Sequence, residues 1–325
     1  MKSLRRILVA IKDPKARRQL ALRKAAQLAA GSGARLELFH AIATPMYMDA
    51  YTLEGQSLRE TQRQWRARAL QQLEKLAAPL REQGLAVTVG SVWDFPAYEA
   101  VIRRAQQVGA ELIVAERHAT RHVLPWLLRF NDWELLRRSP VPVLLLKRAG
   151  SWRKPAVLAA IDPSHGFAKP AKLDHGILTA ASTVNAALGG KLQVAHAWPG
   201  SLVASTRLSA LTPALAATLE RRAARDARTA FAASVERSGI TVARQHFVMG
   251  SPVDAIPRVV RKQRAGIVVM GAVSRSGLKR LVVGNVAEQI LDALPCDVLV
   301  VKPAGFKARV PAKGRGVQLI PTPAY

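Results

Sequence analysis

The sequence is poor in several residue types, and each shortage excludes a class of protein. It contains one cysteine, Cys296, so no disulfide framework can form within the chain. No apolar run approaches the ~20 residues that a membrane-spanning helix needs. The run that follows the basic N-terminus covers only residues 7–11, which indicates a first strand rather than a signal peptide. A cytoplasmic protein without a membrane partner is therefore predicted.

Acidic residues are also scarce. The chain has 22 Asp and Glu against 49 Lys and Arg, which gives a formal net charge of +27. Such a charge is typical of proteins that bind nucleic acid or an anionic surface. The basic residues are nevertheless spread along the chain in short groups, such as residues 63–68 and 258–262, and form no single block. We favour a basic, solvated surface and retain nucleic-acid binding as an alternative.

A length of 325 residues predicts about two domains. The first half contains short apolar runs bounded by turn-forming residues, a pattern typical of parallel strands buried on both faces. Helical stretches lie between these runs, which predicts β-α-β units. The expected strands are residues 7–11, 36–40, 86–92, 112–115 and 141–146, and the expected helices are residues 16–30, 56–83, a segment after Pro96, and 132–138.

The second half repeats this order of elements. Matching landmarks recur at a nearly constant offset, since His40 and His196, and likewise Pro96 and Pro252, are 156 positions apart. A constant offset over a whole half indicates duplication. The expected strands are residues 156–161, 192–197, 241–248, 267–270 and 298–301, and the expected helices are residues 172–188, 212–238, 253–264 and 286–293.

We therefore predict an α/β fold of two tandem doubly wound, Rossmann-like domains. Each is expected to hold a five-stranded parallel sheet of order 3-2-1-4-5, flanked by helices. The domains are expected at residues 1–148 and 155–303 and to pack as an internal pseudo-dimer, with a homodimer of the whole chain left open. The tail, residues 304–325, is basic and rich in proline and glycine without periodicity, which predicts disorder.

The fourth expected strand of the second half runs directly into a glycine-bearing loop. Gly271 stands at the carboxyl end of that strand, where open α/β sheets place their ligands. Gly277 permits a turn, and Gly284 and Asn285 open the next helix, with Asn285 as a suitable N-cap. Free N–H groups at a helix start attract phosphate. The loop is therefore a candidate phosphate cradle.

Three polar residues complete this candidate site. Ser274 and Arg275 offer a hydroxyl and a positive charge, and Asp162 ends the neighbouring first strand. A carboxylate there can accept a bond from an adenine amine or a ribose hydroxyl. Two plainer interpretations stay open: the glycines also fit a strand-to-helix loop without a ligand, and Asp162 also fits a turn or a helix cap before Pro163.

These residues resemble the universal stress protein family. The resemblance rests on the duplicated five-strand unit, on Gly-x2-Ser-x9-Gly-Asn from Gly271 to Asn285, and on Pro-x-x-Val-Leu-Val-Val-Lys ending at Lys302. The first half adds Val-Trp-Asp-Phe-Pro from Val92 and Asp-Trp-Glu-Leu-Leu-Arg-Arg-Ser-Pro from Asp132. The resemblance is to the tandem two-domain type. It implies a doubly wound sheet, a role in stress resistance and, in some members, binding of ATP.

The ATP-binding pattern of that family, Gly-x2-Gly-x9-Gly-(Ser/Thr), falls on Gly271, Ser274, Gly284 and Asn285, with its adenine-side aspartate at Asp162. Two loop positions depart from it. Ser274 adds a Cβ where the backbone approaches phosphate, and Asn285 lacks the hydroxyl. The resemblance implies ATP, or a related phosphate ligand, in the second domain alone.

The first half departs much further from the pattern. Glu116 stands where the second half has Gly271, and Lys12 stands at the position of Asp162. A carboxylate at the phosphate position repels the ligand, so we predict no nucleotide in the first half. Its site is expected to have become a packing surface or a different pocket.

No catalytic or metal centre is expected. The sequence has no Gly-x-Ser-x-Gly elbow, and the glycine loop offers no general base, so a non-enzymatic protein is predicted, with a weak ATPase left open. His118 and His122 stand four apart, but they follow a strand in a loop and lack a third ligand, so no metal is predicted. An apolar, lipid-like ligand is a further alternative.

Overall fold

The structure is a computed structural model, and it describes residues 3–48, 55–117, 125–163, 173–200, 212–271, 285–308 and 310–321. Within these residues the chain divides into two compact units. We call them the first domain, residues 3–151 with residues 306–321, and the second domain, residues 152–305. Among the helices so described, none is long and apolar enough to cross a membrane.

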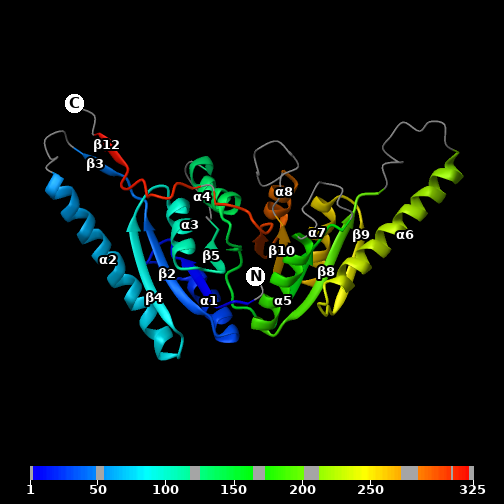
Figure 1. Ribbon diagram of the computed structural model, residues 1–325, viewed down its shortest axis with the longest axis horizontal. Helices are drawn as coiled ribbons and strands as arrows, with labels where there is room; N and C mark the ends of the chain where they lie inside the picture. The colour runs from blue at the N-terminus through cyan, green and yellow to red at the C-terminus, as the bar shows by residue number, and fades with distance from the viewer. Residues whose placement is uncertain are drawn as a thin grey trace. The chain divides into compact units, whose positions relative to one another are not determined.

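The sheet of the first domain is parallel throughout (Figure 1). β1 (Arg6–Ala10) lies at its centre, between β2 (Arg35–Ile42) and β5 (Leu112–Glu116). β4 (Val87–Trp93) pairs with β2, and β6 (Val143–Leu146) pairs with β5, so the order is β4-β2-β1-β5-β6. The central strand is buried almost completely, as expected where helices cover both faces.

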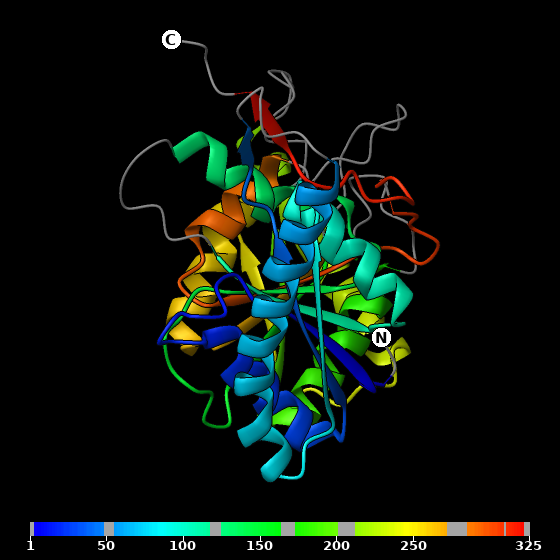
Figure 2. The same cartoon turned by 90° about the vertical axis from the view of Figure 1, so that its left-hand side faces the viewer.

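Helices connect these strands. They are α1 (Leu20–Ser32), α2 (Gly55–Glu82), α3 (Ala97–Gln107) and α4 (Pro125–Arg138). Figure 2 shows the long α2 lying along β4 at the edge of the sheet.

Helix α1 begins four residues later than predicted because Asp13 holds the preceding residues in a turn. The Oδ1 of Asp13 accepts a hydrogen bond from the backbone N–H of Lys15 at 2.8 Å, and its carbonyl accepts one from the N–H of Ala16 at 3.2 Å. Aspartate commonly closes such turns and so competes with helix formation.

The second domain repeats the arrangement. Its parallel sheet has the order β9-β8-β7-β10-β11 within the described residues. The predicted α/β fold of two tandem doubly wound domains is therefore confirmed. The strands are β7 (Ala156–Ala160), β8 (Lys191–Trp198), β9 (Arg244–Met249), β10 (Ile267–Gly271) and β11 (Asp297–Val301), and the helices are α5 (Leu173–Leu188), α6 (Pro213–Arg237), α7 (Pro252–Gln263) and α8 (Asn285–Ala293).

The C-terminal tail departs from the prediction of disorder over residues 304–325. A short strand, β12 (Leu319–Pro321), pairs in parallel with β3 (Met46–Met48) of the first domain (Figures 1 and 2). Val317 packs on the buried side chains of Ile42, Ala69 and Trp93. The basic, glycine-rich composition of the tail does not reveal these contacts, because they are made with residues more than two hundred positions earlier in the chain.

Gly271 has a structural role at the end of β10. A Cβ built on this residue would lie 2.7 Å from Cδ2 of Leu173 and 3.3 Å from Cδ1 of Ile177, both on α5. Contacts of this length are closer than packed carbon atoms tolerate. The missing side chain therefore lets the first turns of α5 lie directly against the strand end.

We expect Gly271→Ala to destabilise the second domain by about 1–3 kcal/mol, because the added methyl group overpacks this contact. Gly176→Ala is the matched control on α5, since its Cβ would meet only Cγ1 of Val301, at 3.9 Å. That control is expected to be neutral or to stabilise by up to about 1 kcal/mol through helix propensity. Urea unfolding of both variants measures the difference, and equal stabilities would contradict the packing role of Gly271.

Candidate functional site

The candidate site lies at the carboxyl edge of the second-domain sheet. β7 and β10 are neighbours, with Ala160 paired to Met270, so Asp162 and Gly271 follow at adjacent strand ends. Asn285 is the first residue of α8, close to its expected place as N-cap. The structure thus brings Asp162 and Gly271 together, as the sequence predicted. The other four predicted residues, Ser274, Arg275, Gly277 and Gly284, lie outside the described residues.

Asp162 is held between α5 and β8. Its backbone N–H donates a hydrogen bond to Oδ1 of Asp174 at 3.3 Å, and Asp174 lies in the first turn of α5. Its carboxylate Oδ1 lies 4.0 Å from Nδ1 of His196, and the Asp162 side chain is 19 % exposed. The geometry gives Asp162 a fixed backbone and a partly accessible carboxylate, which suits an acceptor for an amine or a hydroxyl.

A histidine supports the end of the first strand in both domains. Nδ1 of His196 lies 3.2 Å from the carbonyl oxygen of Ile161, and Nδ1 of His40 lies 2.8 Å from that of Ile11. A carbonyl only accepts, so Nδ1 carries the proton in each ring. Burial lowers the pKa of His40, against the opposing effects of Ile11 and of Asp13, which keeps this ring neutral at neutral pH. The paired histidines are structural supports of the sheet edge.

Glu116 makes a contact that the sequence did not reveal. Its Oε1 accepts a hydrogen bond of 2.7 Å from the backbone N–H of Ala21, in the first turn of α1. Gln19, at the N-cap position of α1, makes no side-chain cap, and the first turn carries no acidic residue. A carboxylate from β5 therefore satisfies a helix N–H group and complements the helix dipole.

The two domains place a carboxylate at this helix end from different positions. Leu20 and Leu173 open α1 and α5, so Ala21 and Asp174 are both second helical residues. At this helix position and at the end of the neighbouring strand, the first domain has Ala21 and Glu116, and the second has Asp174 and Gly271. In the second domain the carboxylate is therefore on the helix, and the end of β10 has no side chain.

Asp174 is the residue that sequence reasoning missed. It is buried, with 5 % of its surface exposed, and it is bonded to the backbone of Asp162. The signal was an acidic residue at the start of an apolar helical stretch, which marks a first helical turn. The sequence alone gave no reason to place it beside Asp162.

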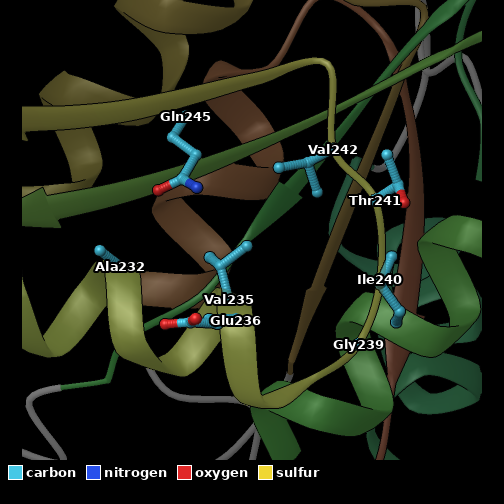
Figure 3. A pocket seen from close by; sticks show the side chains of 8 residues that line it. All are labelled: Ala232, Val235, Glu236, Gly239, Ile240, Thr241, Val242 and Gln245. Carbon is cyan, nitrogen blue, oxygen red and sulfur yellow. The ribbon is translucent and has the colours of Figure 1, made fainter.

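A groove of about 450 Å³ lies elsewhere on the second domain (Figure 3). It opens where α6 ends and β9 begins, so it faces the amino end of β9 and not the carboxyl ends of the strands. Its lining mixes apolar and polar side chains: Ala232, Val235, Glu236, Gly239, Ile240, Thr241, Val242 and Gln245. The groove is therefore separate from the candidate site.

No described residues form a metal centre: over the part of the chain that the structure describes, no group of three His, Cys, Asp or Glu side chains is placed to hold an ion. His118 and His122 lie outside that part.

Trp93 is buried, and its Nε1 donates to the carbonyl oxygen of Thr44 at 2.9 Å.

We expect Glu116→Ala to lower the free energy of unfolding by about 0.5–2 kcal/mol, the usual effect of removing a helix cap. Glu60→Ala is the control, because the contacts of Glu60 are exposed: an ion pair with Arg63 at 3.5 Å and a hydrogen bond of 3.4 Å accepted from Nε2 of Gln64. Such a surface ion pair contributes about 0–1 kcal/mol. Chemical denaturation of both variants tests the assignment. If Glu116→Ala is no less stable than Glu60→Ala, the cap has no energetic role.

Comparisons with known proteins agree with this architecture. The sequence profile of the universal stress protein family matches residues 3–147 and 157–302. Universal stress protein E of Escherichia coli K12 is 27% identical over 313 residues, which span 93% of this chain and 96% of the relative.

Solved structures show the same tandem fold. A protein of unknown function from Pseudomonas aeruginosa PAO1 superposes with a TM-score of 0.67 at 28% identity, covering 93% of this chain and 94% of the other. A universal stress protein from Archaeoglobus fulgidus shares the fold, with a TM-score of 0.60 at 18% identity over 91% of this chain and 98% of the other. With both halves matched by the family profile, this chain belongs to the universal stress protein family and carries two tandem copies of its domain.

Proposed function

We propose that the chain is a non-enzymatic, cytoplasmic stress-response protein whose second domain binds ATP or a related nucleotide. The observation that carries this proposal is the meeting of Asp162 and Gly271 at adjacent strand ends, where doubly wound sheets bind ligands. The family membership supports the same class of function.

Each residue of the proposed site has a chemical role. Asp162 accepts a hydrogen bond from the adenine amine or a ribose hydroxyl, since part of its carboxylate is accessible. The loop from Gly271 to Asn285 supplies backbone N–H groups to the phosphates, assisted by Ser274 and Arg275 and by the turn at Gly277 and Gly284. The start of α8 at Asn285 adds the positive end of a helix dipole.

The first domain lacks these conditions. Glu116 places a carboxylate at the strand end and on the N-terminus of α1, so the positive end of that helix is already complemented. Lys12 replaces the acceptor that Asp162 provides. The proposal therefore assigns one nucleotide to each chain.

Equilibrium titration with ATP tests the site. Gly284→Asp is expected to weaken binding by about tenfold or more, because it sets a charge against the phosphates. Asp162→Ala removes one hydrogen bond and is expected to weaken binding by about three- to tenfold. The matched control is Lys12→Ala in the first domain, which should leave affinity and stoichiometry unchanged. Tight binding that survives Gly284→Asp, or a stoichiometry of two, would contradict the placement.

A second candidate function is binding of nucleic acid, favoured by the net charge of +27 and by exposed arginines on α6, among them Arg221, Arg222 and Arg225. Binding through phosphate contacts weakens steeply as salt rises. A filter-binding assay with DNA and RNA at low salt decides this candidate, since absence of binding there removes it.

A further inference from the structure

The C-terminal tail carries a Gly-Arg-Gly triplet, residues 314–316, that rests on two buried carboxylates of the first domain. Asp94 follows β4 and is 3 % exposed, and Glu99 lies in the first turn of α3 with no exposed surface. We call these two carboxylates the acidic notch. Buried carboxylates require partners, so the chemistry of the notch defines what can occupy it.

Asp94 recognises the backbone of the triplet. Its Oδ1 accepts hydrogen bonds from the N–H groups of Arg315 at 2.8 Å and Gly316 at 2.9 Å. A Cβ on Gly314 would lie 2.7 Å from Asp94 Oδ2, and Gly316 has a φ of 77°. Residues with a side chain are excluded at position 314 by contact and disfavoured at 316 by conformation.

Glu99 recognises the arginine side chain. Nε of Arg315 donates to Glu99 Oε2 at 3.0 Å, and Nη2 donates to Oε1 at 2.7 Å. This two-point contact fits the planar guanidinium and not a lysine ammonium. Burial alone would raise the pKa of Glu99, but the hydrogen bonds and charges of Arg315 and Arg103 outweigh it and lower that pKa.

The charge of the notch is balanced only when the tail is in place. Within the first domain's own elements, Arg103 contacts both Asp94 and Glu99, so one guanidinium faces two carboxylates. Arg315 supplies the second positive charge. A buried charge without a partner is strongly unfavourable. The notch therefore selects a segment that carries one arginine.

Contacts on both sides of the triplet extend the recognition. Upstream, the carbonyl oxygen of Pro311 accepts a hydrogen bond of 3.0 Å from Arg103. Downstream, the N–H of Phe95 donates to the carbonyl oxygen of Gly316 at 3.1 Å, and Val317 packs on Trp93. The strand pair of β12 and β3 follows. The occupant is thus an extended peptide and not a free amino acid.

The second domain lacks this site. The residues 156 positions after Asp94, Glu99 and Arg103 are Gly250, Ala255 and Val259. Met249, which matches the buried Trp93, is 57 % exposed. The two copies of the domain can thus be compared. Among the described residues, the first copy has both the acidic notch and a bound tail segment, and the second copy has neither.

We propose that Asp94 and Glu99 form a recognition site for a Gly-Arg-Gly peptide, and that the chain's own tail is its resident, exchangeable ligand bound in the same molecule. The site recognises the peptide backbone through Asp94 and the arginine through Glu99. It is independent of the proposed nucleotide site, which belongs to the second domain.

Hydrogen exchange on the full chain tests the resident ligand. Arg315→Ala is expected to speed exchange of the Gly316 amide by about tenfold or more, because the anchoring guanidinium is lost. Arg315→Lys should not restore protection fully, since an ammonium cannot make both bonds. Lys313→Ala removes a neighbouring exposed positive charge and should leave exchange unchanged.

A peptide with the sequence of residues 310–321 tests exchange of the ligand. The attached tail competes at a high effective concentration of roughly millimolar. The peptide should therefore bind the Arg315→Ala chain about tenfold more tightly than the wild-type chain. A peptide with alanine in place of the arginine, or with valine in place of the first glycine, should bind neither chain. These peptide variants test the notch without altering the protein fold.

Three results would overturn the proposal. They are equal exchange in the Arg315→Ala and Lys313→Ala chains, failure of the peptide to bind the Arg315→Ala chain, and equal binding of the wild-type and alanine peptides. Protection of Gly316 that rises with protein concentration would also overturn it, because it would assign the notch to the tail of a second copy.

Discussion

A parallel sheet collects the carboxyl ends of its strands and the amino ends of the following helices at one edge, and the helix N–H groups there need an acceptor. Each domain has a carboxylate at the start of its first helix. In the first domain Glu116, on the neighbouring strand, accepts a hydrogen bond from the helix N–H of Ala21. In the second domain Asp174, on the helix itself, accepts one from the backbone N–H of Asp162. Where the carboxylate comes from the strand, the strand end is filled. Where it lies on the helix, a glycine ends the strand and the helix packs against it.

Much of the fold could be read from the sequence because buried parallel strands are apolar throughout and short. The central strands were therefore located to within a residue or two. The sequence places the start of α1 four residues too early, since a turn closed by Asp13 has the same residue pattern as the beginning of a helix. The prediction of disorder in the tail is wrong because composition describes a segment in isolation, whereas Arg315 is held by Glu99, which is distant in sequence.

The candidate site was predictable only in part. Asp162 and Gly271 come together because neighbouring strands align their ends, which follows from the order of the elements. The sequence predicts that Glu116 is incompatible with phosphate, but its bond to Ala21 depends on where α1 begins. No sequence motif marks Asp174 as a residue of the site. Contacts between a strand end and a helix start depend on register, and a single sequence does not reveal register.

The separation of Asp94 and Arg315 also orders events during synthesis. The two residues are 221 positions apart, with the whole second domain between them. At ordinary rates of translation, the first domain emerges on the order of ten seconds or more before its last segment exists. Through that interval its carboxylates at Asp94 and Glu99 share the single guanidinium of Arg103. The first domain is thus synthesised first but completed last. A chain truncated before Arg315 would lack a segment of its first domain.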